Sequence, residues 1–588
     1  MSSDSLDRLL LELEESKRRF GVENAVRLER LLTLLARRRF PDSDSLIRFH
    51  EALLFIRAYP PSPAVLRIAD SLLATFGERV ERLRSTGEDM TPFDYIENSG
   101  IARTTLHGMY SYGIARWLAD RHRPSTEIDW ERLERKERLG TNLPRIIPLL
   151  DEDALTEANI PYLEWIHTAK KRRMSDLAWL IERLEKFPLS EKEKSTLYDS
   201  LELWIRWELD DSRTSRTKNI RAPRKIFYHV ERLIRRSEVS VAEELSSPLP
   251  LAKLSLNQGK AILDRCRDTT CVRYRELYGI AYGDPTTVVR ADAGRGVEIF
   301  LWGLPLERRL PLRGYHCGFT LKNGVPINYI EGITLFERME LGFNTFYTYR
   351  DGETAWVYAK ALRALNLVAG ATCFSIDPYQ LGFNNDEAIE SGAFWFYRKL
   401  GFRPTHKKLE RLTQSEERKI SANVEYRTSA RMLRRLSAGP AVYEAPGTSR
   451  GDWDTFHIRN LGLTVARRMA RDFDGEAARI REASIQQVAG SLGLRVAGMR
   501  PVARRVFEDL ALVLAMIPDF RRWNHSDKKA VGAIVEAKIS LDESEYLNRL
   551  QNHARLRAAL IALGSRAPRK PDDSLCDSRS HDELTPSK

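Results

Sequence analysis

Residues 391–403 read Ser-Gly-Ala-Phe-Trp-Phe-Tyr-Arg-Lys-Leu-Gly-Phe-Arg, and this stretch carries the strongest information about the fold. The aromatic run predicts a helix that packs on a sheet, and Leu400 closes its apolar stripe. Gly401 supplies the left-handed residue with which many helices end, because glycine has no Cβ to clash in that conformation. Phe402 then starts the next strand. The segment therefore predicts the helix, turn and strand of a mixed α/β domain.

The residues upstream predict several strands that lead into this helix. Asn323-Gly324 separates two strand-like runs. An Asn-Gly pair in such a place is the strongest short signal for a hairpin, because both residues tolerate positive φ. Helical patterns follow the third and fourth runs. The expected strands are Gly314–Thr320, Val325–Ile330, Met339–Tyr349 and Ala371–Ile376, and the expected helices lie around Val357–Leu365 and Asp386–Leu400.

The string Phe-Tyr-Arg-Lys-Leu-Gly-Phe within residues 391–403 resembles the last helix and following turn of the GNAT superfamily of acyl-CoA N-acetyltransferases. The order of elements before it is also similar to that family, in which a central strand runs into a turn and helix that cradle the CoA pyrophosphate. The resemblance covers Arg273–Thr405. It implies acetyl-CoA or another acyl-CoA as the donor and direct transfer of the acyl group to an amine.

The resemblance places the pyrophosphate turn at residues 349–355. The family pattern there is Gln/Arg-x-x-Gly-x-Gly/Ala. When the sequence is aligned on Gly352, the middle glycine of the pattern matches. Tyr349 stands where the pattern has Gln or Arg, and Thr354 stands where it has the final Gly or Ala. Arg350 and Ala355 are of the expected types, but each lies one position after the expected one. A helix that starts here would offer unpaired N–H groups to an anion.

An ordinary capped turn is the alternative at this place, because Asp351 and Glu353 can satisfy the same N–H groups. A second departure lies in the last helix, where Glu390 stands in place of the usual asparagine and Asn385 belongs to the preceding loop. The exposed strand edge before the turn is expected to hold the pantetheine arm. The residues expected to bind the donor are Asn344, Thr345, Phe346, Arg350, Asp351, Gly352, Glu353, Thr354 and Asn385.

The catalytic candidates are one phenol and two carboxylates. The resemblance implies that Tyr397 is the general acid, and a phenol with a pKa of about 10 suits the return of a proton to a thiolate. The alternative is that Tyr397 only packs in the core beside its aromatic neighbours. Glu337 and Glu340 are the candidate general bases, and Glu331 at the end of the preceding strand is a further carboxylate that could take a proton from an amine.

The composition predicts a multidomain protein with ordinary globular parts. The 588 residues are 42% hydrophobic and 30% charged, with a net charge of +12. Apolar positions recur with helical spacing before and after the central segment. We expect an α-helical region at 1–265 with a possible boundary near 211–225, a central α/β GNAT-like mixed sheet at 266–437, an α-helical domain at 438–563 and a disordered tail at 564–588. Within the first region, helices are expected around Ile101–Ala119, Ile160–Ile166, Asp176–Phe187 and Thr196–Leu209.

Several classes of protein receive no support. The five cysteines form no CxxC pair and have no His-x3-His partner, so neither a metal site nor a disulfide scaffold is expected. The polar, acidic N-terminus is unlike a signal peptide, and the longest apolar run, Ala511–Pro518, is too short for a bilayer span. We therefore expect a cytoplasmic protein without a membrane partner. The basic runs lack interleaved aromatic residues, so nucleic acid is not supported as a partner.

The resemblance to the GNAT superfamily implies an acyl-CoA-dependent N-acyltransferase, most simply an N-acetyltransferase. The acceptor would be the amine of a small molecule or of a protein. One alternative is a catalytically degenerate GNAT-like scaffold that binds a protein partner through its helical regions. Another is an aminoacyl-tRNA-dependent transferase, because related folds use such donors and the positive charge would suit RNA.

Overall fold

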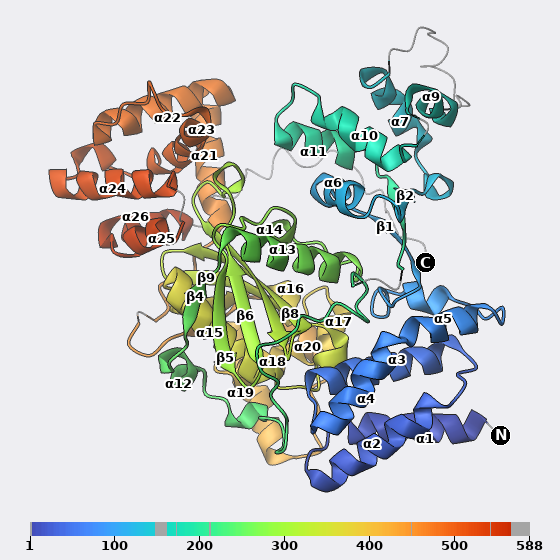
Figure 1. The fold of residues 1–588 in the computed structure, drawn as a ribbon. Coiled ribbons are helices and arrows are strands. Elements are labelled where there is room, and N and C mark those ends of the chain that lie inside the picture. The colour runs from blue at the N-terminus through green and yellow to red at the C-terminus, as the bar shows by residue number, and fades with distance from the viewer. Residues whose placement is uncertain are drawn as a thin grey trace.

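The computed structural model describes residues 3–147, 162–171, 173–210, 213–448, 450–540 and 543–565. Helices at the N-terminal end, a central sheet with helices around it, and a helical C-terminal part follow one another along the chain (Figure 1). This order agrees with the expected multidomain arrangement. The expected tail lies outside the described residues from position 566 onward.

The first helices form where capping residues and apolar stripes predict them. Asp42 caps the third helix by accepting a hydrogen bond from Ser45 N, and Ser62 caps the fourth in the same way through Val65 N. Pro63 occupies the first turn of that fourth helix, where its missing N–H costs nothing. These helices are α1 (Ser3–Ser16), α2 (Val22–Ala36), α3 (Ser43–Ala58), α4 (Pro63–Ala74) and α5 (Phe76–Arg84), and α3 lies at the centre of the group with most of its residues buried.

The expectation of an entirely helical region up to residue 265 is wrong. Strands β1 (Thr105–Met109), β3 (Trp204–Glu208) and β2 (Thr126–Ile128) form a three-stranded antiparallel sheet in that order. Trp204–Glu208 alternates with period two, since Ile205 and Trp207 are buried and Arg206 and Glu208 are not. The helix expected at Thr196–Leu209 is therefore replaced in its second half by a strand. Helices α6 (Tyr112–Arg121), α7 (Lys136–Asn142), α9 (Tyr162–Ala169), α10 (Asp176–Glu185) and α11 (Glu191–Asp199) surround the sheet.

The central sheet has nine strands in the order β11-β12-β10-β9-β8-β7-β6-β5-β4. All neighbours are antiparallel except β9 and β10, which are parallel. The sheet extends beyond both expected limits of the central segment, because β4 precedes residue 266 and β12 follows residue 437. The strands are β4 (Leu251–Lys253), β5 (Val289–Gly294), β6 (Val297–Trp302), β7 (Gly314–Lys322), β8 (Val325–Leu335), β9 (Arg338–Thr345), β10 (Cys373–Ile376), β11 (Arg403–Pro404) and β12 (Ala441–Glu444).

The predicted hairpin turn joins β7 to β8 and also fixes the N-terminal helices to the sheet. Asn323 has φ 49° and Gly324 has φ 83°, as a two-residue hairpin turn requires. The Asn323 amide donates to the backbone oxygens of Ala58 (2.8 Å) and Phe227 (3.0 Å). Arg57 of α3 donates to the Asn323 carbonyl at 3.1 Å. The end of α3 is therefore held against the tip of this hairpin.

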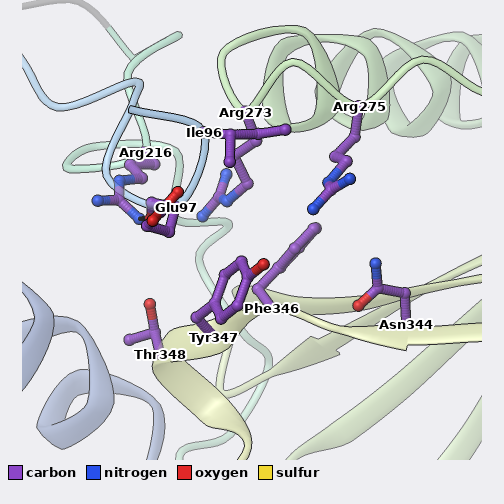
Figure 2. Close-up of a pocket in the computed structure, with 9 residues that line it drawn as sticks. All are labelled: Ile96, Glu97, Arg216, Arg273, Arg275, Asn344, Phe346, Tyr347 and Thr348. Atoms are coloured by element: carbon purple, nitrogen blue, oxygen red, sulfur yellow. Dashed lines mark hydrogen bonds between the residues drawn. The ribbon is translucent and has the colours of Figure 1, made fainter. Parts of the chain in front are cut away.

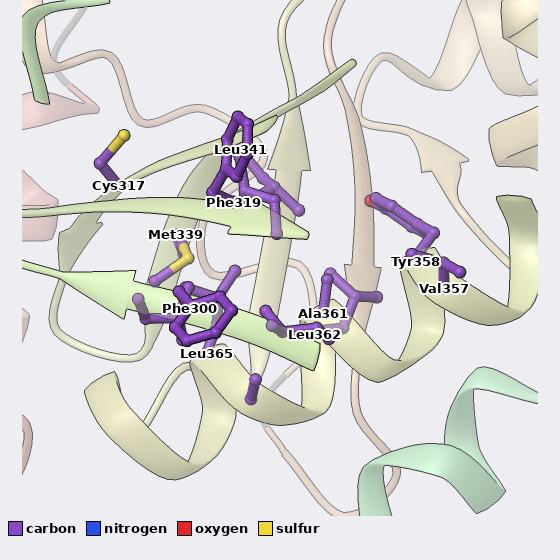
Figure 3. Close-up of a cluster of buried hydrophobic side chains, with 14 of the residues drawn as sticks. Phe300, Cys317, Phe319, Met339, Leu341, Val357, Tyr358, Ala361, Leu362 and Leu365 are labelled. Atoms are coloured by element: carbon purple, nitrogen blue, oxygen red, sulfur yellow. The ribbon is translucent and has the colours of Figure 1, made fainter. Parts of the chain in front are cut away.

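Helices cover both faces of the central sheet. On one face, α15 (Thr354–Ala369) packs its buried stripe on Met339 and Leu341 of β9 (Figure 3). On the other face lie α13 (Leu256–Cys271) and α14 (Tyr278–Ala281). Gly279 approaches the sheet so closely that an added Cβ would lie 2.5 Å from Cys317 Cβ, which excludes a larger residue there.

The remaining helices follow the sheet strands. The single helix expected at Asp386–Leu400 is divided at Gly392, which has φ 68°, into α17 (Asp386–Glu390) and α18 (Ala393–Lys399). The other helices of this part are α12 (Val241–Ser246), α16 (Pro378–Leu381), α19 (Lys407–Ala422) and α20 (Ala430–Leu436). The C-terminal part consists of α21 (Ile458–Phe473), α22 (Ala477–Leu492), α23 (Pro501–Leu514), α24 (His525–Lys538), α25 (Glu543–Gln551) and α26 (Ala554–Gly564). Within the described ranges, no helix has the length and apolar character needed to cross a membrane.

Candidate functional site

The candidate site is a cleft that opens where two parallel strands of the sheet part. β9 and β10 pair only from Arg338↔Cys373 to Glu340↔Ser375. β9 then continues to Thr345, whereas β10 ends at Ile376 and the chain turns away into α16. A cavity of about 440 Å³ lies between them. Its walls include Arg275, Tyr329, Glu331, Gly342–Thr345, Arg350, Thr354, Gln380, Asn385, Glu387, Ser391, Phe396 and Tyr397.

The β9 edge of the cleft presents backbone groups. Gln380 Nε2 donates to the Leu341 carbonyl at 3.1 Å, and Arg350 Nε donates to the Thr345 carbonyl at 3.3 Å, both from the cleft side. Phe343 lies between these residues and shares their parity, so its N–H and C=O face the same side. The edge of β9 can therefore form hydrogen bonds with an extended ligand laid along it.

Tyr397 lies on the opposite wall, on α18. Its ring packs edge-on against Tyr358, Phe396 and Phe402, with ring centroids 5.7, 5.3 and 5.5 Å away. No other described residue forms a hydrogen bond with its hydroxyl group. Burial raises the pKa of Tyr397 well above its ordinary value, so the phenol keeps its proton at neutral pH. Tyr397 thus packs in the aromatic core and also lines the cleft.

Glu331 is the carboxylate that reaches the cleft. It lies on β8 opposite Gly342 of β9, and an added Cβ on Gly342 would lie 3.8 Å from Glu331 Cβ. Tyr315 donates its hydroxyl hydrogen to the Glu331 carboxylate. Burial raises the pKa of Glu331, although the Tyr315 hydrogen bond counteracts the shift. A carboxylate with a raised pKa in a cleft is suited to accepting a proton from an amine.

The structure places the other two candidate bases outside the cleft. Glu337 accepts hydrogen bonds from Arg557 Nε (2.9 Å) and Trp453 Nε1 (2.7 Å), so it attaches the start of β9 to the C-terminal part. Glu340 pairs with Arg313 at 2.7 Å and with Arg338 at 3.4 Å. Glu340 shares a sheet face with Asn344, as its strand parity predicts, but the cleft opens only beyond Glu340, where β10 diverges.

The turn expected to bind pyrophosphate is covered by the N-terminal helices. A Cβ added to Gly352 would lie 2.4 Å from the hydroxyl oxygen of Tyr59, the residue that directly follows α3. The Gly352 N–H is already used, because it donates to the Tyr349 carbonyl at 2.9 Å. Asp351 faces Arg18, with 3.4 Å between the charged groups. The expectation that a diphosphate lies against Gly352 therefore conflicts with this packing.

Glu353 belongs to a buried ion cluster on the same side of the turn. Its carboxylate accepts hydrogen bonds from Arg295 Nε (3.1 Å), Lys322 Nζ (3.2 Å) and Ile234 N (3.2 Å). Burial lowers the pKa of Lys322 to about 8, against the attraction of Glu353. Glu353 thus holds the turn to Arg295, Lys322 and Ile234. These partners are distant in the chain, so the local sequence pattern could not identify them.

The other expected donor-binding residues fall into two groups. Asn344, Thr345, Arg350, Thr354 and Asn385 line the cleft. Phe346 lies beside it, in contact with Arg273, whose guanidinium carbon is 4.4 Å from the ring centroid. Arg350 also pairs with Glu387 at 2.6 Å, so it closes one end of the cleft as part of an ion pair.

A second, small cavity adjoins the cleft (Figure 2). Its volume is about 20 Å³, and Arg275 and Asn344 line both cavities. No sequence pattern singles out its arginines, of which Arg273 and Arg275 lie shortly after the end of α13. The lining consists of Ile96, Glu97, Arg216, Arg273, Arg275, Asn344, Phe346, Tyr347 and Thr348.

Comparison with known proteins leaves the family of the chain open. No family model, no curated protein and no solved structure matches it. The cleft and its residues are therefore the features that bear on function.

Proposed function

We propose that the chain is an N-acyltransferase that moves an acyl group from an acyl thioester, of which acetyl-CoA is the simplest, to an amine bound in the cleft. The observation that carries this proposal is the parting of β9 and β10 beside two complementary groups. A carboxylate with a raised pKa, Glu331, and a protonated phenol, Tyr397, line the same cleft. One group suits removal of a proton and the other suits its return.

The donor arm would lie along the open edge of β9. The N–H and C=O of Phe343 are available to an amide-containing chain such as pantetheine, and a backbone N–H there can polarise the thioester carbonyl. Holding both substrates in one cleft would supply much of the rate enhancement. The cleft volume of about 440 Å³ is in the range of small-molecule sites.

The transfer step uses the two side chains in turn. Glu331 takes the proton of the ammonium group, and the free amine attacks the thioester carbon. As the C–N bond forms and the C–S bond breaks, the sulfur leaves with the electron pair, and the hydroxyl of Tyr397 supplies its proton. The nitrogen of the adduct then loses its second proton to solvent, Glu331 releases the proton that it took, and the phenolate of Tyr397 recovers a proton from solvent before the next turnover. Charges and atoms balance without a redox partner.

The closed turn at residues 351–353 requires a different contact for the phosphates of the donor. Arg350 lies at the cleft and can approach a phosphate, whereas the Gly352 N–H donates to the Tyr349 carbonyl and Tyr59 packs against the glycine. The same closure favours a second candidate, a scaffold without a CoA site. It also suits a donor without a diphosphate, such as an aminoacyl-tRNA.

Titration of acetyl-CoA into the full chain by calorimetry separates these candidates. We expect saturable heat that disappears in Gly342→Phe, because a ring at that position would fill the cleft beside Gln380 and Glu331. Glu340→Gln, on the same strand but outside the cleft, is the matched control and should bind normally. Absence of heat in the unaltered chain would favour the scaffold. Retention of tRNA that falls steeply with salt would favour the RNA donor. A cytoplasmic location remains our prediction.

A further inference from the structure

The small cavity beside the cleft has the character of an oxyanion site. We propose that Arg273 and Arg275 bind the carboxylate or phosphate group of the acceptor, so that the acceptor is a small amine that carries an anionic group. This inference rests on the proposed function for the role of the ligand as acceptor. The anion site itself rests on the arginines alone.

Arg273 is the main argument for the site. The residue is 6% exposed, and its Nε has no hydrogen-bond partner among the described residues. No carboxylate of the described residues forms an ion pair with it; its contacts are the Thr269 carbonyl, at 3.0 Å from Nη1, and the face of Phe346. Figure 2 shows the guanidinium extending from the end of α13 into the cavity. A buried charge without a counter-ion is costly, and an anionic ligand would remove that cost.

The charges around the cavity leave a positive excess. Arg216 is compensated, because Glu51 lies 2.7 Å from it. Glu387 forms an ion pair with Arg350 at 2.6 Å and a longer one with Arg275 at 4.0 Å, so a single carboxylate is shared by both arginines. Among the residues that line the small cavity itself, Arg216, Arg273 and Arg275 are basic, and the exposed Glu97 is acidic. Burial and the proximity of Arg216 lower the pKa of Arg273 to about 10, which still leaves it charged at neutral pH.

The small cavity adjoins the part of the cleft where the amine of the acceptor would bind. Arg275 and Asn344 form the boundary between the cavity and the cleft. Glu331 lies opposite Gly342 of β9 in the strand register. Gly342 and Asn344 are two residues apart on β9, so Glu331 and Asn344 lie on the same face of the sheet. An anion held by Arg273 and Arg275 would therefore place an attached amine on the side of the sheet where Glu331 can take its proton.

The size of the cavity restricts the ligand. A volume of about 20 Å³ is little more than one water molecule needs, so the cavity admits the oxygen atoms of a small anionic group and not a nucleotide. A guanidinium recognises carboxylate and phosphate oxygens with two parallel hydrogen bonds. Amino acids and phosphorylated amines therefore fit the site better than neutral polyamines.

The anion site is tested first, on the full chain and without any transfer reaction. Thermal unfolding is followed in sodium acetate or sodium phosphate and compared with sodium chloride at equal ionic strength. We expect acetate or phosphate to raise the melting temperature of the unaltered chain, and we expect Arg273→Met to abolish this rise. In chloride alone, Arg273→Met should be at least as stable as the unaltered chain, because it removes an unpaired buried charge. Arg479→Gln, an exposed arginine paired with Asp474 at 3.0 Å, is the control and should keep the response.

The acceptor role is tested with matched amines. Glycine is compared with glycinamide, and O-phosphoethanolamine with ethanolamine, in an assay that measures thiol release from acetyl-CoA. We expect the anionic member of at least one pair to be preferred at least tenfold in kcat/KM, and we expect the preference to vanish in Arg275→Gln.

The outcomes separate the two proposals. Equal transfer to both members of each pair would overturn the acceptor inference while the transferase function stands. Arginine-dependent stabilisation by anions without transfer to any amine would remove the transferase function and the acceptor role, and it would leave the anion site. Stabilisation that is equal in chloride, acetate and phosphate would overturn the site.

Discussion

The hydroxyl oxygen of Tyr59 lies only 2.4 Å from the position that a Cβ atom of Gly352 would occupy. Tyr59, which directly follows α3, thus packs on the turn that precedes α15, although it is far from Gly352 in the sequence. Arg18 and Asp351 add a second contact at the same place. The N-terminal helices therefore cover the side of the turn that would otherwise be open to a ligand.

This packing predicts the effect of a small change at Gly352. Gly352→Ala should destabilise the chain by about 1–3 kcal/mol, because the added methyl group clashes with the Tyr59 ring. Urea unfolding measures the change. In a Tyr59→Ala background the penalty should largely disappear. Gly462→Ala on α21, where a Cβ meets nothing within 4 Å, is the control and should be neutral or stabilising by up to about 1 kcal/mol. Equal effects at both glycines would contradict the contact.

The proposed general acid is tested by removal of one oxygen atom. Tyr397→Phe should lower kcat about 100-fold, with little change in stability or in affinity for acetyl-CoA, since its hydroxyl bonds to no other described residue. Tyr358→Phe is a close control. Tyr358 lies 5.7 Å from Tyr397 between ring centroids, and its buried hydroxyl has no hydrogen-bond partner in the described part of the chain either. Steady-state thiol release measures both variants, and unchanged turnover in Tyr397→Phe would exclude this residue from the mechanism.

The pH dependence of transfer should report on Glu331. Because burial raises the pKa of this carboxylate, the acidic limb of kcat/KM should lie at higher pH than for an ordinary glutamate. The Tyr315 hydrogen bond favours the charged form, so Tyr315→Phe should raise the pKa further and move the limb to still higher pH. Glu331→Gln should abolish the limb together with most of the activity. A limb that does not move in Tyr315→Phe would assign the base elsewhere.

Glu51 predicts a loss of stability in acid. Burial raises the pKa of Glu51, but the ion pair with Arg216 and hydrogen bonds from His50 and Thr348 outweigh it and bring the pKa from 4.5 to about 2. Since the folded value lies below the unfolded one, the contribution is complete above about pH 4.5 and is lost as the pH falls toward 2. Glu51→Gln should remove roughly 1–3 kcal/mol at pH 7 and less at pH 3. Urea unfolding at both pH values measures the difference, and a pH-independent cost would contradict the assignment.

The buried cluster at Glu353 predicts an asymmetry between its members. Glu353→Gln leaves Lys322 buried without a carboxylate partner and should cost about 3–5 kcal/mol. Lys322→Met should cost less, because Glu353 keeps its ion pair with Arg295 at 2.5 Å. Thermal or urea unfolding compares the two variants, and a larger cost for Lys322→Met would reverse the argument.

Local sequence signals predicted the elements with clear periodicity or turn chemistry. The Asn323-Gly324 hairpin, the aromatic helix that contains Tyr397 and its glycine cap follow from backbone preferences and side-chain spacing, which depend on adjacent residues. The three-stranded sheet of the N-terminal half was missed because its strands are short and lie next to helices. β4 and β12 were missed because a short strand is recognised mainly by the partner with which it pairs.

The candidate site was predictable only in part. Tyr397 and Asn344 could be assigned from motif and parity, because both properties are local. The choice of Glu331 over Glu337 and Glu340 depended on where β10 leaves β9, and the covering of Gly352 depended on the docking of α3. Arg273 and Arg275 became significant only because packing buries one of them beside a cavity. Burial, charge pairing and cavities arise between segments that are distant in the chain, so the tertiary structure alone decides them.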